Sequence, residues 1–223
     1  MIKEKVYKEK KIEKSVILPG DPFGLPDDFK VVVFIDNAYL IRLKNYFFED
    51  KFSYSVKNLV EFLAEKNNFF VSKIYLYDAP PFQSKQSNER EKKMKENYDK
   101  FISFFKMQGF IVREGRTQRL RVGDSFIYRQ KGVDMLLGID MIGILKEFPK
   151  LKTVILLSGD SDFVPVVKKL KSFGIKVVLW TYFEKNRKNP FSRSNYLIDS
   201  VDEFIKLNKE DFVGCKIKEL ENE

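Results

Sequence analysis

The alternation of apolar runs and amphipathic stretches along the chain predicts a protein of the α/β class. Residues 30–35 (KVVVFI) form a continuous β-branched run, as expected for a central parallel strand that is covered on both faces. Apolar residues at helical spacing follow over 55–66 and again over 88–108, where Gly109 ends the pattern. The later predicted elements are strands 72–77, 110–113, 125–129, 154–157 and 176–180, and helices 134–146 and 163–173. We therefore expect a doubly wound, mostly parallel sheet flanked by helices.

Three further stretches complete this organisation. An Arg-rich loop is expected before the strand at 125–129, and residues 194–207 are predicted to form a strand or turn followed by a short helix. Residues 1–28 are interpreted as a basic arm and a Pro/Gly linker, residues 29–207 as the domain, and residues 208–223 as a C-terminal tail. The arm could be a solvated terminus or a phosphate-binding tail. The first interpretation is favoured, because charge runs are usually solvated.

Composition removes several kinds of chemistry. The 223 residues are 43% hydrophobic, which suits one globular domain, and they include no His and a single Cys, Cys215. Ser-His-Asp and Cys-His catalysis, His-ligated zinc and an intrachain disulfide are thereby excluded. The charged N-terminus does not resemble a signal peptide and no apolar run is long enough to span a membrane, so a cytoplasmic protein without a membrane partner is expected.

Carboxylates follow several of the predicted strands. Asp36 comes directly after the first strand, Asp78 after the second, and Asp160 and Asp162 after the strand at 154–157, while Asp134 opens a helix. Ligands bind outside the carboxyl ends of the strands in such sheets. If the strands at 30–35 and 154–157 are neighbours, these acids converge, and a hard cation such as Mg²⁺ or Mn²⁺ would relieve their repulsion.

Each acid also has a local explanation. Asp134 and Asp162 could cap helices, Asp36 could belong to an Asx-turn, and Asp78 could form a turn before two prolines. Taken singly, these local roles explain the acids at least as well as a metal does, and only the combination favours a metal. Asp140 lies about 240° around the helix from Asp134, so helix geometry gives it no part in the site.

Basic residues gather in the middle of the chain. Residues 83–131 hold thirteen Lys and Arg against six Asp and Glu, which is most of the net charge of +9. Arginine binds phosphates bidentately and aromatic rings accept unpaired bases, so RNA is the expected partner. The candidate contacts are Arg116, Arg119, Arg121, Arg129 and Lys131, interleaved with Phe126 and Tyr128. The alternative is a solvated hairpin whose arginines pair with the helix at 88–100; a second basic loop spans 185–193.

Four segments together resemble the NYN domain, a branch of the PIN-like nuclease superfamily, and specifically its LabA-like members. They are VVVFIDNAYL (31–40), KGVDMLLGIDM (131–141), LLSGDSDFVPVVKKLKSFGIKVVLW (156–180) and SNYLIDSVDEFIKL (194–207). The resemblance implies a PIN-like α/β/α fold and a metal-dependent ribonuclease site. The family's acids fall on Asp36, Asp134, Asp160 and Asp162, and Asp140 also matches a recurrent family acid.

One position departs from the family pattern. Many members have Asn three residues after the first Asp, where this chain has Tyr39; Asn37 lies nearby but is not equivalent. Asn37 and Ser158 are kept, with Asp140, as secondary candidates.

The leading hypothesis is an endoribonuclease in which Asp36, Asp134 and Asp160 hold Mg²⁺ or Mn²⁺ and Asp162 assists, with an activated water hydrolysing the phosphodiester. The alternative is an RNA-binding or regulatory protein whose site no longer cleaves. A phosphatase is disfavoured because Asp36 is followed by Asn37 and Ala38, which lack the second acid of an aspartyl-phosphate pair. The sequence leaves the oligomeric state open.

Overall fold

A six-stranded parallel sheet forms the centre of the protein. The structure, a computed structural model, describes residues 29–48, 52–184, 189, 191 and 195–217. Within these residues the strand order is β3-β2-β1-β6-β7-β8. The strands are β1 (Lys30–Asp36), β2 (Phe70–Asp78), β3 (Ile111–Glu114), β6 (Thr153–Leu157), β7 (Lys176–Thr181) and β8 (Glu203–Lys206).

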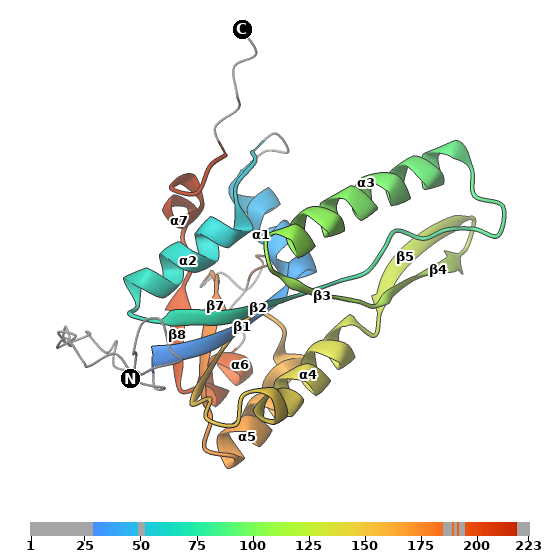
Figure 1. Ribbon diagram of the computed structural model, residues 1–223. Helices are drawn as coiled ribbons and strands as arrows, with labels where there is room; N and C mark the ends of the chain where they lie inside the picture. The colour runs from blue at the N-terminus through green and yellow to red at the C-terminus, as the bar shows by residue number, and fades with distance from the viewer. Residues whose placement is uncertain (1–28, 49–51, 185–188, 190, 192–194, 218–223) are drawn as a thin grey trace, which may run out of the picture.

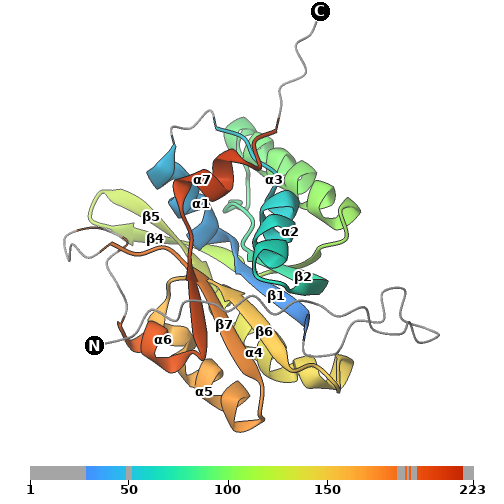
Figure 2. The same ribbon diagram turned by 90° about the vertical axis from the view of Figure 1, so that its left-hand side faces the viewer.

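Helices cover both faces of this sheet, which makes three layers (Figures 1 and 2). One face carries α1 (Asn37–Phe47), α2 (Val56–Lys66), α3 (Glu89–Met107) and α7 (Lys209–Val213). The other carries α4 (Val133–Glu147), the short 3₁₀ helix η2 (Ser161–Phe163), α5 (Val164–Ser172) and α6 (Asn195–Ser200). The predicted α/β/α fold class is confirmed.

The sequence of β1 explains its central position. Val31, Val33 and Ile35 pack into one apolar core, and Val32 and Phe34 pack into the other, all without solvent exposure. A strand buried on both faces needs apolar residues at every position rather than at alternate ones.

The sheet reverses its strand order between β1 and β6. From β1 the chain builds outward through β2 and β3, and then returns to place β6 on the other side of β1, with Ile35 opposite Leu157. The expectation that these two strands are neighbours is confirmed. Their carboxyl ends therefore deliver Asp36 and the segment after Leu157 to the same edge, at the position where open α/β sheets bind ligands.

An antiparallel hairpin combines the predicted Arg-rich loop with the strand predicted at 125–129, so a hairpin, which the sequence offered as an alternative, is present. It consists of β4 (Arg116–Val122) and β5 (Ser125–Lys131) and projects from the carboxyl edge of the sheet beside the start of α3 (Figure 1). The loop prediction was wrong because β4 has no buried face. Its residues are all exposed or half-exposed, so no apolar alternation marks the strand.

Two other local predictions also need correction. Residues 194–207 contain a helix followed by a strand, α6 and then β8, in the reverse of the predicted order. The helix α1 was not predicted, because its apolar stripe is short and Asp36, a possible Asx-turn residue in the sequence, is in fact its N-cap.

The structure also bears on the two ends of the domain. Residues 208–217, which the sequence set aside as tail, pack onto the domain: Phe212 is fully buried and Cys215 nearly so. The arm at 1–28 lies outside the described residues, as does the basic loop at 185–193 apart from Asn189 and Phe191.

Candidate active site

Asp36 stands at the carboxyl end of β1 and also caps α1. Its Oδ1 accepts a hydrogen bond from the Tyr39 backbone N–H at 3.1 Å, and its Oδ2 accepts one from Ser158 Oγ at 3.0 Å. Only 5% of the residue is exposed. Burial raises the pKa of Asp36 above its ordinary value, and these two hydrogen bonds offset part of that shift. The carboxylate is thus fixed in orientation, and ionising it costs free energy.

Ser158 connects Asp36 to the next acids. It is fully buried directly after β6, and its Oγ also accepts a hydrogen bond from the Asp160 backbone N–H at 3.2 Å. Asp160 in turn caps η2, where its Oδ1 accepts from the Asp162 backbone N–H at 2.9 Å. A continuous hydrogen-bonded chain therefore runs from the end of β1 to Asp162. Ser158 was named only as a secondary candidate, and the structure gives it a positioning role.

Asp134 approaches the same edge from the first turn of α4. The cap of α4 is Gly132, whose φ of +81° few other residues adopt, so Asp134 is not the capping residue that the local explanation supposed. Burial and the negative charges of Asp160 and Asp162 raise the pKa of Asp134. The charge of Asp134 likewise contributes to the raised pKa of Asp36. Asp134 is thus within electrostatic range of each of the other three predicted acids.

The acids do not form a closed metal cage. Within the described parts of the chain, no three acidic or Cys side chains are grouped so that they could ligate one ion. Mg²⁺ needs fewer protein ligands, because it keeps several waters and binds through one or two carboxylates together with substrate phosphates. An all-oxygen donor set whose members repel each other has the chemistry that such a hydrated cation requires.

Asp140, by contrast, faces away from this cluster. It accepts hydrogen bonds from Arg113 Nε at 2.9 Å and from the Tyr77 hydroxyl at 3.0 Å. It therefore ties α4 to β2 and β3, as its position around the helix from Asp134 indicated.

Asn37 and Asp78 form a second buried pair. Asn37 Nδ2 donates to Asp78 Oδ2 at 2.6 Å, while Asp78 Oδ1 accepts from the Ala79 N–H at 2.7 Å and from Gln130 Nε2 at 3.0 Å. The two residues join the start of α1, the end of β2 and β5. Asn37 is thus committed to a structural contact.

Tyr39 joins α1 to the end of β7 through its hydroxyl group. Its hydroxyl accepts from the Tyr182 N–H at 2.7 Å, donates to the Tyr182 carbonyl at 3.1 Å and lies 3.0 Å from Thr181 Oγ1. Its ring lies so close to Gly159 that a Cβ there would be 2.5 Å from Tyr39 Cε2. The tyrosine therefore ties α1 to β7 and supports the loop that carries Asp160.

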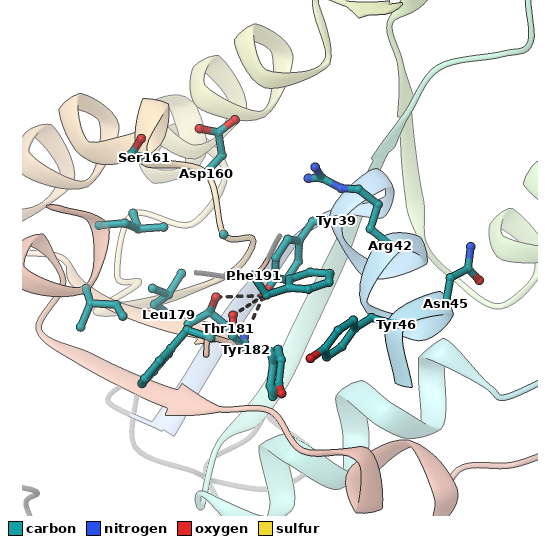
Figure 3. A pocket seen from close by; sticks show the side chains of 14 residues that line it. Tyr39, Arg42, Asn45, Tyr46, Asp160, Ser161, Leu179, Thr181, Tyr182 and Phe191 are labelled. Atoms are coloured by element: carbon teal, nitrogen blue, oxygen red, sulfur yellow. Dashed lines mark hydrogen bonds between the residues drawn. The ribbon is translucent and has the colours of Figure 1, made fainter. Parts of the chain in front are cut away.

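Sequence reasoning missed a cavity beside Asp160 (Figure 3). It has a volume of about 550 Å³ and lies between α1, the loop after β6 and the end of β7. Arg42 lines the cavity. Its positive charge offsets part of the rise in the pKa values of Asp36 and Asp134. Arg42 lies three residues after Tyr39, so recognising α1 as a helix would have placed both residues on one face.

The predicted RNA contacts divide between the two faces of the hairpin. Pairing places Arg116 opposite Lys131 and Arg129 opposite Gln118, so these three cations share one face. Arg119 and Arg121 lie on the other face, where the Arg119 guanidinium packs against the rings of Phe82 and Phe126. The ion pairs described for α3 are formed within that helix, but the charge of Arg119 helps to lower the pKa of Glu91 on α3, so the alternative of a hairpin whose arginines interact with this helix stays open.

The fold is that of a PIN-like domain. A family model described as "NYN domain" matches residues 30–208, and the chain therefore belongs to the NYN domain family, within the PIN-like nuclease superfamily. No curated protein matches the chain.

A solved structure shares the fold. It is the crystal structure of a protein of unknown function from Vibrio parahaemolyticus, with a TM-score of 0.54 and 21% sequence identity. The match covers 83% of this chain and 96% of that one. Separately, none of the helices in the described ranges is both long and apolar enough to cross a membrane.

Proposed function

We propose that this protein is a metal-dependent endoribonuclease. The observation that carries the proposal is the hydrogen-bonded chain Asp36–Ser158–Asp160 at the point of strand reversal, with Asp134 in electrostatic range. A fold does not establish an activity, but perturbed carboxylates at the ligand-binding edge of a nuclease fold support one.

The ion would be Mg²⁺ or Mn²⁺, held by Asp134, Asp160 and Asp36, directly or through water. When bound, it would lower the pKa of a water molecule and stabilise negative charge on the phosphate oxygens. Asp162 extends the negative field around this position, since its charge acts on Asp134.

The chain's own residues supply orientation and phosphate binding. Ser158 forms hydrogen bonds with both Asp36 and the Asp160 backbone. These bonds would hold the two acids in place, so that they need not reorganise when the substrate binds. Arg42 and the exposed face of Arg116, Arg129 and Lys131 provide cations for the phosphates on either side. In-line attack by water would leave a 5′-phosphate and a 3′-hydroxyl.

A cleavage assay on end-labelled single-stranded RNA tests this proposal. We expect cleavage with Mg²⁺ or Mn²⁺ and none with chelator. Asp160→Asn should lower the rate by more than about 100-fold, because even residues that only support a metal ligand cost up to about that much. Asp99→Asn on α3, which removes an exposed carboxylate far from the site, serves as the control. Full activity of Asp160→Asn would exclude the assignment.

A second candidate function rests on Tyr39. Its hydroxyl is engaged in hydrogen bonds at the position where many family members have Asn, so a protein that binds RNA without cleaving it is the alternative. In that case RNA affinity would fall with salt while no divalent ion supported cleavage.

A further inference from the structure

Aromatic rings form one wall of the cavity beside Asp160. Tyr46 and Phe191 have ring centroids 5.1 Å apart, and Tyr182 lies 5.7 Å from Tyr46 and 5.9 Å from Phe191. Rings at these separations pack against one another, and Figure 3 shows them together at one side of the cavity, with Tyr39 next to Phe191. The cavity volume of about 550 Å³ falls in the range of small-molecule pockets, about 300–1,000 Å³.

The rings are held in place before any ligand arrives. Asn189 Nδ2 donates to the Tyr46 hydroxyl at 2.8 Å, and Asn189 Oδ1 accepts from the Phe191 N–H at 2.8 Å. The Tyr39 hydroxyl fixes the Tyr182 backbone at the rear. Tyr46 nevertheless keeps 42% of its surface exposed. A preorganised ring with a free surface can bind a flat ligand at little cost in entropy.

The rim of the cavity adjoins the proposed catalytic edge. Asp160 and Ser161 line it on one side and Arg42 on the other, with their side chains extending above the rings (Figure 3). Arg42 forms no ion pair among the residues that the structure describes, and its charge acts on both Asp36 and Asp134. We therefore expect a ligand with two parts: one that fills the cavity, and a negatively charged one that lies at the rim beside Arg42.

We propose that this cavity binds the unpaired base of a nucleotide adjacent to the cleaved bond, with Arg42 on that nucleotide's phosphate. The inference rests on the proposed function and deepens it, since it makes single-stranded RNA, or an RNA with an extruded base, the substrate class. A flat ring covalently joined to a phosphate matches an aromatic hollow with a cation and the acids at its rim. Stacking on an aromatic side chain tolerates any base, so the pocket requires a base without selecting its identity.

Binding of small ligands tests the pocket without any need for cleavage. We would titrate the full chain with adenosine 5′-monophosphate, uridine 5′-monophosphate and ribose 5-phosphate, and follow binding by NMR or calorimetry. The two nucleotides should bind about tenfold more tightly than ribose 5-phosphate, as expected for one stacked base. Tyr46→Ala should remove this difference, whereas Tyr46→Phe, which keeps the ring, should preserve it.

The matched control is Tyr196→Ala on α6. Tyr196 is 81% exposed and does not line the cavity, although the next two residues, Leu197 and Ile198, do. The Tyr196→Ala substitution should leave the preference for nucleotides over ribose 5-phosphate unchanged. Equal affinity for ribose 5-phosphate and the nucleotides, or an unchanged preference in Tyr46→Ala, would overturn the proposal.

A second experiment joins the pocket to cleavage. In a series of RNAs with one abasic position each, loss of the base at a single position beside the cut should lower kcat/KM about tenfold. The same abasic RNA should show no further loss with Tyr46→Ala. If removal of the base at every position left cleavage unchanged, the base-binding role of the cavity would be refuted, whereas the proposed nuclease function would not. If no RNA is cleaved, the proposed function fails and the monophosphate titration alone decides the pocket.

Discussion

Single residues at the carboxyl edge of the sheet carry several constraints at once. Asp36 ends a strand, caps a helix and accepts a hydrogen bond from Ser158. Gly159 leaves room for the Tyr39 ring, which in turn fixes the end of β7. Substitutions here therefore act on the fold and on the site together, and the predictions below separate the two effects.

Ser158→Ala should weaken both stability and cleavage. It removes a hydrogen bond from the buried Asp36 and leaves the Asp160 N–H without its acceptor, so we expect a loss of about 1–3 kcal/mol in the free energy of unfolding. The rate of RNA cleavage should fall about 10- to 100-fold at saturating Mg²⁺. Urea unfolding and a single-turnover assay measure the two effects. Ser172→Ala, an exposed serine on α5, should change neither; a fully active Ser158→Ala would rule out the positioning role.

Gly159→Ala should destabilise the fold by about 1–3 kcal/mol, since its Cβ would lie 2.5 Å from Tyr39 Cε2. In a Tyr39→Asn background the ring is absent, so the same substitution should cost at least about 1 kcal/mol less. Urea unfolding of the two single variants and the double variant closes this cycle. Gly143→Ala, on α4 with open space around its Cβ position, is the control. Additive costs would show that the ring does not press on Gly159.

At the scale of elements, the β4–β5 hairpin carries cations at the base from which the chain enters the acid-bearing helix α4. Register places Arg116 and Lys131 opposite each other at its base, and Gly132 then turns the chain into the helix that carries Asp134. The other face is occupied by contacts with its own neighbours: Arg119 packs against Phe82 and Phe126, and Arg121 pairs with Asp124. The face with Arg116, Arg129 and Lys131 is therefore the one we expect to meet RNA.

Neutralising that face tests the assignment. The triple variant Arg116→Gln, Arg129→Gln and Lys131→Gln should reduce the slope of log affinity against log salt by about 2, because each phosphate that a cation neutralises on a single strand contributes about 0.7 to that slope. Fluorescence anisotropy with single-stranded RNA, in chelator, gives this slope. Arg121→Gln is the control from the opposite face. If the triple variant kept the wild-type slope, RNA would have to bind a different surface of the protein.

At the scale of the whole molecule, gathering acids at one edge costs stability at neutral pH. The pKa of Asp134 is raised in the folded protein, by burial and by Asp160 and Asp162. The folded state thus holds this proton more tightly than the unfolded chain does. Stability must then fall as the pH rises from the ordinary carboxyl value of 3.8 through the raised one, and the full cost is present above the raised pKa.

Asp134→Asn should therefore stabilise the metal-free protein at pH 7, and the gain should shrink as the pH is lowered toward the ordinary carboxyl value. Thermal unfolding in chelator across this range measures the effect, with Asp99→Asn as the exposed control. Saturating Mg²⁺ should stabilise the wild type more than Asp134→Asn. A variant that is less stable at pH 7, or a gain that is independent of pH, would contradict the electrostatic account.

Local sequence determined much of the scaffold. The apolar run of β1, the helical stripes of α2 and α3, and the βαβ unit of β6, α5 and β7 were all predictable, because burial of a strand or a helix face requires a periodic pattern of apolar residues. The acids that end these strands could be named for the same reason.

Only the tertiary structure decided how those acids and their neighbours are used. The spacing of Asp140 and Asn37 along the chain does not reveal that Arg113 and Asp78 bind them. Nor could the cavity at Tyr46 be foreseen, because its lining comes from segments more than a hundred residues apart that share no local pattern. Sequence periodicity records which side of an element is buried, whereas a site depends on which elements meet, and that is decided by the packing of the whole sheet.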